Sequence, residues 1–211
     1  MGRKSIEKER KPLSKKQKLW LARTMPYFYE VGINGPTMND IAAHLGLSKA
    51  TIYNYYQSKE ELVHDALWTK LKELEGFRDL LFDDSLDFIE RYYKGVNFFA
   101  ESLKGMTERY LDDLEKSYPE SWKSVELFKQ KSVENLTAYY NAGIEQGILR
   151  PFNVEVMASY DLAFFNMMIS PDFLSKNRIT IAQAFREYFN MKFNGVLVER
   201  NLSMITSYQK N

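Results

Sequence analysis

Residues 37–63 of the chain read TMNDIAAHLGLSKATIYNYYQSKEELV, and this stretch decides the fold. Thr37 with Asp40 three residues later is a capping-box pattern, which predicts the start of a helix. Gly46 supplies the tight turn that ends this helix. Ser48 is a good N-cap for a second short helix, which we expect from residue 49 to about 55. Two short helices joined by a glycine turn are typical of a helix-turn-helix.

The residues around the two short helices predict how they pack. Ala42 is small enough to let the two helices cross closely, and Ile52 and Tyr56, four residues apart, predict a buried side of the second helix that faces the first and fourth helices. Ser58 with Glu61 forms another capping-box pattern and predicts a fourth helix from residue 59 to about 74.

The second short helix carries the side chains that a DNA-reading helix needs. A helix that lies in a major groove should expose donors and small groups and no acids. No acidic residue occurs between Asp40 and Glu60. The expected exposed face carries Lys49, Thr51, Asn54 and Tyr55.

With these residues in place, the stretch closely resembles the TetR family of bacterial regulators over about residues 19–63. The matching positions are Phe28, Gly32, Thr37, Asp40, Ile41, Ala42, Gly46, Ser48, Lys49, Thr51, Tyr53, Ser58, Lys59 and Glu60. The resemblance implies sequence-specific binding to a double-stranded DNA operator, repression released by an unidentified small-molecule effector, and a homodimer formed by the last two long helices. Beyond residue 63 the resemblance is only architectural.

The resemblance also implies roles for individual residues. Thr37, Lys59 and Tyr53 resemble positions that contact DNA phosphates, although Tyr53 could equally be a partly buried core residue. Ala50 could touch a thymine methyl group. The residues predicted to contact DNA are Thr37, Lys49, Ala50, Thr51, Tyr53, Asn54, Tyr55 and Lys59.

Charge is distributed unevenly along the 211 residues, although the net charge is only +1. Residues 1–60 hold 11 Lys and Arg against 5 Asp and Glu, a net charge of +6, and the remaining residues have a net charge of −5. A basic front half on a mildly acidic body suggests a polyanion-binding module. We expect residues 1–13 to be a flexible basic arm, either simply solvated or supporting DNA affinity.

Composition excludes several classes of protein. The chain has no cysteine, which rules out disulfide frameworks, thiolate catalysis and cysteine zinc sites. No uncharged run is long enough to span a bilayer, and the first 18 residues lack the apolar segment of a signal peptide. We therefore expect a cytoplasmic protein that does not interact with membranes and needs no cofactor. His44 and His64 have no partners at metal-ligand spacing, so we expect no metal site.

Helical periodicity continues through the rest of the chain, which predicts an all-α fold. We expect a helix-turn-helix DNA-binding domain at residues 14–62 and a larger helical effector and dimerisation domain at residues 63–211. In the second domain, helices are expected at about 84–103, 107–116, 119–146, 153–169 and 180–200. The last of these is apolar on more than one side, which indicates burial against its own core and against a partner subunit.

Pro26 departs from the pattern of the resembled family. It lies inside the first expected helix, residues 14–31, where proline removes a backbone hydrogen bond. We expect it to kink or split that helix.

An effector pocket is expected among the middle helices of the body, lined by apolar and aromatic groups. The aromatic content of 15% favours an apolar or aromatic effector over a highly charged one. Asp161 lies among apolar neighbours and could be a polar anchor or a rim residue. The candidate lining residues are Phe98, Phe99, Met106, Tyr110, Phe128, Tyr139, Tyr140, Asp161, Phe164, Phe165 and Met168.

Three other interpretations compete with a ligand-responsive regulator. A purely structural helical hairpin would explain the short helices without DNA. An enzyme would need a nucleophile–base pair, a metal cluster or a phosphate loop, and none is recognisable, so we expect no catalytic activity. A ligand-independent adaptor that binds DNA and other proteins would have almost no internal pocket.

Overall fold

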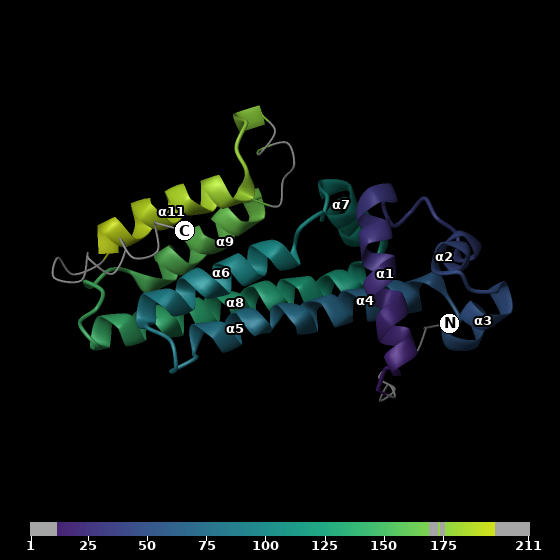
Figure 1. The fold of residues 1–211 in the computed structure, drawn as a ribbon, viewed down its shortest axis with the longest axis horizontal. Helices are drawn as coiled ribbons and strands as arrows, with labels where there is room; N and C mark the ends of the chain where they lie inside the picture. The colour runs from purple at the N-terminus through teal and green to yellow at the C-terminus, as the bar shows by residue number, and fades with distance from the viewer. Residues whose placement is uncertain (1–11, 169–172, 174–175, 197–211) are drawn as a thin grey trace, which may run out of the picture.

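The computed structural model describes residues 12–168, 173 and 176–196, and every regular element in these ranges is a helix. Figure 1 shows a bundle of long helices lying roughly side by side, with a small group of helices at one end. The all-α fold predicted from the sequence is confirmed. In the described part of the chain, no helix is long and apolar enough to cross a membrane.

The small group at one end contains the first three helices (Figure 1). These are α1 (Lys15–Val31), α2 (Met38–Leu45) and α3 (Lys49–Tyr55). The capping box at Thr37 is present, because the Thr37 hydroxyl accepts from the amide of Asp40 while the Asp40 carboxylate accepts from the amide of Thr37. Gly46 ends α2 in the left-handed conformation, at φ 71°, which glycine adopts without a Cβ penalty.

The start of the next helix differs in one detail from the prediction. α4 spans Lys59–Leu74, and the Ser58 hydroxyl accepts from the amide of Glu61 as expected. The Glu61 carboxylate, however, accepts from the amide of Gln57, at 2.9 Å, so the reciprocal half of the predicted capping box lies one residue earlier.

The first helix is continuous through Pro26, so the expectation that this proline splits the helix is wrong. Pro26 is exposed, while Leu21 and Phe28 are almost completely buried on the opposite side. Burial of that apolar face holds the helix together where one backbone hydrogen bond is missing.

The body contains six described helices after α4, arranged as a bundle in Figure 1. Their bounds are α5 (Gly76–Leu81), α6 (Phe88–Ser102), α7 (Glu108–Ser117), α8 (Pro119–Glu145), α9 (Val154–Met168) and α11 (Ile181–Val196). The short α5 was not predicted, and α6 begins four residues later than expected. Residues 197–200 of the predicted last helix, and most of the predicted basic arm, lie outside the described residues.

Two apolar clusters form the core, and helix α7 belongs to the first of them. The first cluster joins α1–α4 to α7 and to the start of α8, whereas the second lies among α5, α6, α8, α9 and α11. The division predicted between residues 62 and 63 falls within α4, and the separation into two domains stays a prediction. The helix-turn-helix and the body are thus joined through a shared core.

Candidate nucleic-acid interface and effector cavity

Helix α3 presents the predicted DNA-contacting side chains on the outside of the molecule. Thr37, Lys49, Ala50, Tyr53, Asn54 and Tyr55 are exposed, and Thr51 and Lys59 are half-buried. The opposite side of α3 is anchored by Ile52 and Tyr56, at 0% and 1% exposure. The predicted buried face of α3 is therefore confirmed.

Local contacts orient several of these exposed side chains. The Thr51 and Ser48 hydroxyls lie 2.8 Å apart, and the ammonium of Lys49 lies 5.9 Å from the centre of the Tyr53 ring. Tyr55 packs edge-on against Trp20 of α1, with ring centroids 5.0 Å apart. Because Tyr53 is 41% exposed, its ring is not part of the core.

Thr37 has a competing partner in the absence of DNA. Its hydroxyl donates to the Asp40 carboxylate at 2.6 Å, and its amide donates to the same oxygen at 2.8 Å. These hydrogen bonds lower the pKa of Asp40. A DNA phosphate at this helix start would have to share the Thr37 donors with a carboxylate.

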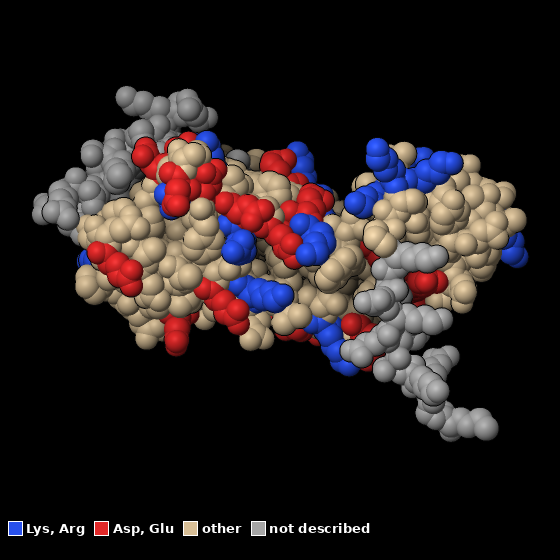
Figure 2. Space-filling view, turned by 90° about the horizontal axis from the view of Figure 1, so that it is seen from below, with Lys and Arg blue, Asp and Glu red and all other residues tan. Residues whose placement is uncertain are grey.

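Figure 2 shows how charge is distributed on one face of the molecule. Acidic side chains are concentrated over the body, while Lys and Arg outnumber them toward the end that carries α1–α3.

The histidine in α2 packs against an aromatic ring. His44 stacks on Tyr27, with ring centroids 4.2 Å apart. The described residues contain no cluster that could hold a metal ion.

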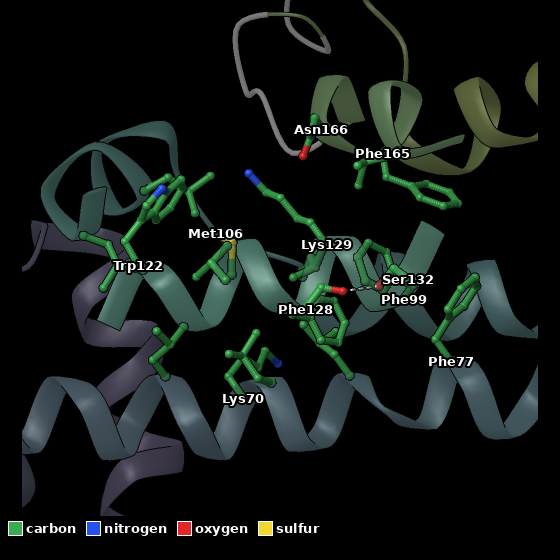
Figure 3. A pocket seen from close by; sticks show the side chains of 18 of the residues that line it. Lys70, Phe77, Phe99, Met106, Trp122, Phe128, Lys129, Ser132, Phe165 and Asn166 are labelled. Carbon is green, nitrogen blue, oxygen red and sulfur yellow. Dashed lines mark hydrogen bonds between the residues drawn. The ribbon is translucent and has the colours of Figure 1, made fainter. Parts of the chain in front are cut away.

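A cavity of about 100 Å³ lies between the middle helices of the body. Figure 3 shows its lining side chains, which come mainly from α4, α6, α7, α8 and α9 and are mostly apolar or aromatic. Phe99, Tyr110, Phe128 and Phe165 of the predicted set line this cavity, as does Met106. The polar side chains that line it are Lys70, Lys129, Ser132 and Asn166.

The two lysines at this cavity already have partners. Lys70 pairs with Glu73 at 3.0 Å, and Lys129 pairs with Glu126 at 3.0 Å. The ammonium of Lys129 also lies 4.8 Å from the centre of the Trp122 ring. The cavity interior is therefore apolar, with its cations held by carboxylates.

Three other predicted pocket residues lie in a separate buried cluster. Asp161 of α9 is completely buried and pairs with Lys192 of α11. The Asp161 carboxylate also accepts from the hydroxyls of Tyr92, at 3.0 Å, and of Tyr140 and Tyr188. Tyr139 donates to the carbonyl oxygen of Phe88 at 2.7 Å. Complete burial excludes the alternative that Asp161 is a rim residue.

Lys192 was not predicted as a functional residue, although its position carried a signal. It lies three residues after Phe189 and four before Val196, on the apolar stripe of α11. A charged residue on such a stripe indicates a buried partner. Desolvation lowers the pKa of Lys192, and the nearby Asp161 charge opposes this shift.

Burial of tyrosines predicts a loss of stability at high pH. Desolvation is the largest cause of the raised tyrosine pKa values, including that of Tyr118 at about 12. The same direction holds for Tyr29, Tyr92, Tyr110, Tyr139, Tyr140 and Tyr188. In the unfolded chain these groups titrate near pH 10, so above that pH the unfolded state binds fewer protons and is favoured.

We therefore expect the free energy of unfolding to fall above about pH 10. Each tyrosine that stays protonated in the folded state lowers it by up to about 1.4 kcal/mol per pH unit. Lys192 acts in the opposite direction, but it is one group against several. Urea unfolding followed by tryptophan fluorescence between pH 8 and 11 measures this change. A free energy that stays constant up to pH 11 would contradict the prediction.

Comparisons with known proteins agree with this geometry. The family model described as "Bacterial regulatory proteins, tetR family" matches residues 21–66, which include α2 and α3. The HTH-type transcriptional regulator YvaF of Bacillus subtilis is 25% identical over 77% of this chain and 86% of its own length. The HTH-type transcriptional repressor KstR2 of Mycobacterium tuberculosis is 26% identical over 59% of this chain and 64% of its own length.

Solved structures share this fold over most of the chain. The TetR family regulator PfmR from Thermus thermophilus has a TM-score of 0.65 at 25% identity, covering 83% of this chain and 97% of that one. A TetR-family regulator from Marinobacter aquaeolei has a TM-score of 0.70 at 18% identity, covering 93% and 98%. At that identity, the second match concerns the fold alone.

The exposed helix-turn-helix and these relatives define the class of protein: the chain is a transcriptional regulator that binds DNA. Within that class, residues 21–66 match the TetR family model, the family that the sequence between residues 19 and 63 resembles.

Proposed function

We propose that this regulator is a homodimeric repressor which leaves its operator when a small apolar effector occupies the cavity between α4, α6, α7, α8 and α9. The observation that carries this proposal is the apolar cavity itself, because one of its walls, α7, also packs against α1 of the DNA-binding end. The repressor KstR2 among the relatives supports repression over activation. Such a regulator acts in the cytoplasm, where bacterial DNA lies.

The proposed mechanism is a shift between two arrangements of the dimer. The two recognition helices must lie about one DNA turn apart, ~34–36 Å, to enter successive major grooves. An effector that fits one arrangement of the body better than the other would change this spacing and weaken DNA binding.

An apolar face on α9 and α11 supports dimerisation through these helices. Exposed Val156, Tyr160 and Met167 lie on one side of α9, and Met191 of α11 is 76% exposed. Apolar side chains that gather into a patch on a surface indicate a site of protein–protein interaction. The proposed dimer would cover them in a four-helix interface.

Introducing charge on this face should separate the subunits. We expect Met191→Glu, combined with Tyr160→Glu, to turn the dimer into a monomer at micromolar concentration, because the interface would bury unpaired carboxylates. Light scattering coupled to size-exclusion chromatography measures the mass. Leu127→Glu on α8, where an apolar side chain is 52% exposed, is the matched control and should leave the dimer intact. If the variant with both substitutions, Met191→Glu and Tyr160→Glu, remains a dimer, this interface is excluded.

DNA binding tests the proposed function directly. The full chain should bind a palindromic duplex from the region upstream of its own gene, with an affinity that falls steeply as salt rises. Thermal-shift screening of metabolites and drugs should find compounds that stabilise the protein, and these compounds should release the duplex. Failure to bind any upstream duplex would refute the proposal.

The ligand-independent adaptor remains the second candidate. It predicts almost no internal cavity, whereas the body encloses about 100 Å³. The adaptor interpretation would be favoured if the protein binds the duplex but no compound that stabilises the protein changes that binding.

A further inference from the structure

Asp113 of α7 binds the loop that leads into the helix-turn-helix. Its carboxylate oxygen Oδ2 accepts from the amides of Ile33, at 2.8 Å, and of Asn34, at 3.1 Å. Its other oxygen, Oδ1, accepts from Nδ2 of Asn34 at 2.8 Å. A single carboxylate, 79 residues away in sequence, therefore satisfies three donors of the segment between α1 and α2, and hydrogen bonds to a charged acceptor are stronger than neutral ones.

Asn34 connects this carboxylate to the end of the molecule that faces DNA. Its side chain also donates to the Ser117 hydroxyl of α7, at 2.9 Å. Its carbonyl oxygen accepts from the ammonium of Lys59, at 3.4 Å, the residue at the start of α4 that we predict to contact phosphate. The loop, α7 and the start of α4 thus meet at one asparagine.

The backbone at Gly32 lies so close to side chains of α7 that a Cβ there would require them to shift. A Cβ added at Gly32 would lie 2.6 Å from Nε of Arg109 and 2.7 Å from Oδ2 of Asp113. Gly32 also has a φ of 79°, which L side chains rarely adopt. Glycine at this position therefore lets the loop lie directly against the side chains of Arg109 and Asp113.

The neighbouring side of α7 forms a wall of the effector cavity. Tyr110, Leu111 and Leu114 of α7 all line that cavity, as does Met106 just before the helix. Tyr110 also contacts α1, because its ring lies edge-on to Tyr29 with centroids 5.0 Å apart. The Thr107 hydroxyl, at the start of α7, donates to the carbonyl oxygen of Tyr29 at 2.9 Å. Any change in the cavity that displaces α7 would also move the groups bound to the DNA-binding end.

We propose that Asp113 is a positioning residue that ties residues 32–34 to α7, so that the positions of α2, α3 and Lys59 depend on the position of the cavity wall. The inference rests on the proposed function, because it assigns a regulatory contact to the same cavity. In the DNA-binding state, the carboxylate of Asp113 holds the loop in place. When α7 moves, the three hydrogen bonds break together and the recognition helix loses its fixed position.

Removing the carboxylate tests the first half of this inference. We expect Asp113→Ala to weaken binding of the full chain to the upstream duplex about tenfold, within the 5- to 150-fold range typical of coupled sites. Asp112→Ala is the matched control, because Asp112 is the adjacent acid of α7, is exposed and pairs only locally with Lys116 at 2.8 Å. It should bind as the wild type does. Asp113→Asn, which keeps one acceptor oxygen for the loop amides, should recover part of the loss.

A cavity-filling substitution tests the transmission itself. Leu111→Phe enlarges a half-buried side chain of α7 that lines the cavity, and so stands in for an effector. We expect it to weaken duplex binding at least fivefold in the wild-type background and less than twofold in the Asp113→Ala background. A merely structural role of Asp113 would make the two losses multiply, and that result would overturn the inference.

Hydrogen exchange supplies a readout that does not depend on DNA. The amides of Ile33 and Asn34 should exchange faster in Leu111→Phe than in the wild type, although the substitution is made at a residue that lines the cavity. Unchanged exchange at both amides would overturn the inference even if the wild type failed to bind the duplex. Failure of wild-type DNA binding with faster exchange in the variant would refute only the proposed function.

Discussion

Replacing Lys192 with methionine is expected to lower the free energy of unfolding by about 3 kcal/mol, the lower end of the range for breaking a buried ion pair. The substitution leaves the Asp161 carboxylate buried without a cation. Three tyrosine hydroxyls still donate to that carboxylate, which keeps the expected loss at the lower end. Urea unfolding at pH 7 measures the difference.

The double variant separates the charge from the shape of the site. Asp161→Asn combined with Lys192→Met removes both charges and keeps an acceptor for the tyrosines. We expect it to be within about 1 kcal/mol of the wild type, because replacing both partners of a buried pair is often neutral. Lys116→Met, which removes an exposed lysine paired with Asp112, is the control and should change stability by less than about 0.5 kcal/mol. A double variant as unstable as Lys192→Met would show that the lost stability is not due to unpaired charge.

Introducing an acid on the recognition helix is expected to abolish specific DNA binding. Ala50→Glu adds a carboxylate to the exposed face of α3, where the major groove and its phosphates would lie. We expect the affinity for the upstream duplex to fall at least 100-fold, or about 2.7 kcal/mol, because the charge is repelled by the phosphates and blocks close approach to the base edges. Fluorescence anisotropy with a labelled duplex measures the affinity.

The matched control changes the net charge of the protein by the same amount at another place. Ala138→Glu adds a carboxylate to an exposed position of α8 in the body. It should bind the duplex within about threefold of the wild type, and both variants should unfold at the wild-type temperature. Equal losses of affinity in the two variants would mean that overall charge, and not contact by α3, explains the effect.

Pro26 and α5 mark the limits of local pattern in this chain. Backbone chemistry alone predicts that Pro26 kinks or splits the first helix, yet α1 is not split. Burial of Phe28 and Leu21 outweighs one missing hydrogen bond, and the amount of that burial depends on how the other helices pack against α1. The short α5 was missed because six residues are too few to display a helical period.

The cavity was only partly predictable for a similar reason. Aromatic residues at helical spacing marked the interior of the body, but they could not be divided between a cavity and a closed core. The structure divides them: Phe99, Tyr110, Phe128 and Phe165 line the cavity, whereas Tyr139 and Tyr140 pack away from it. Which of these side chains an effector contacts stays a prediction.

The sequence by itself determined the helix-turn-helix between residues 37 and 63, because caps, turns and apolar faces depend on residues only three or four positions apart. It also indicated the family resemblance, and which side chains contact DNA stays a prediction. Only the tertiary structure decided that Asp113 binds the loop at Ile33 and Asn34, and that Lys192 meets Asp161. Each of these contacts joins residues 31 to 80 positions apart, and such pairings depend on how whole helices pack.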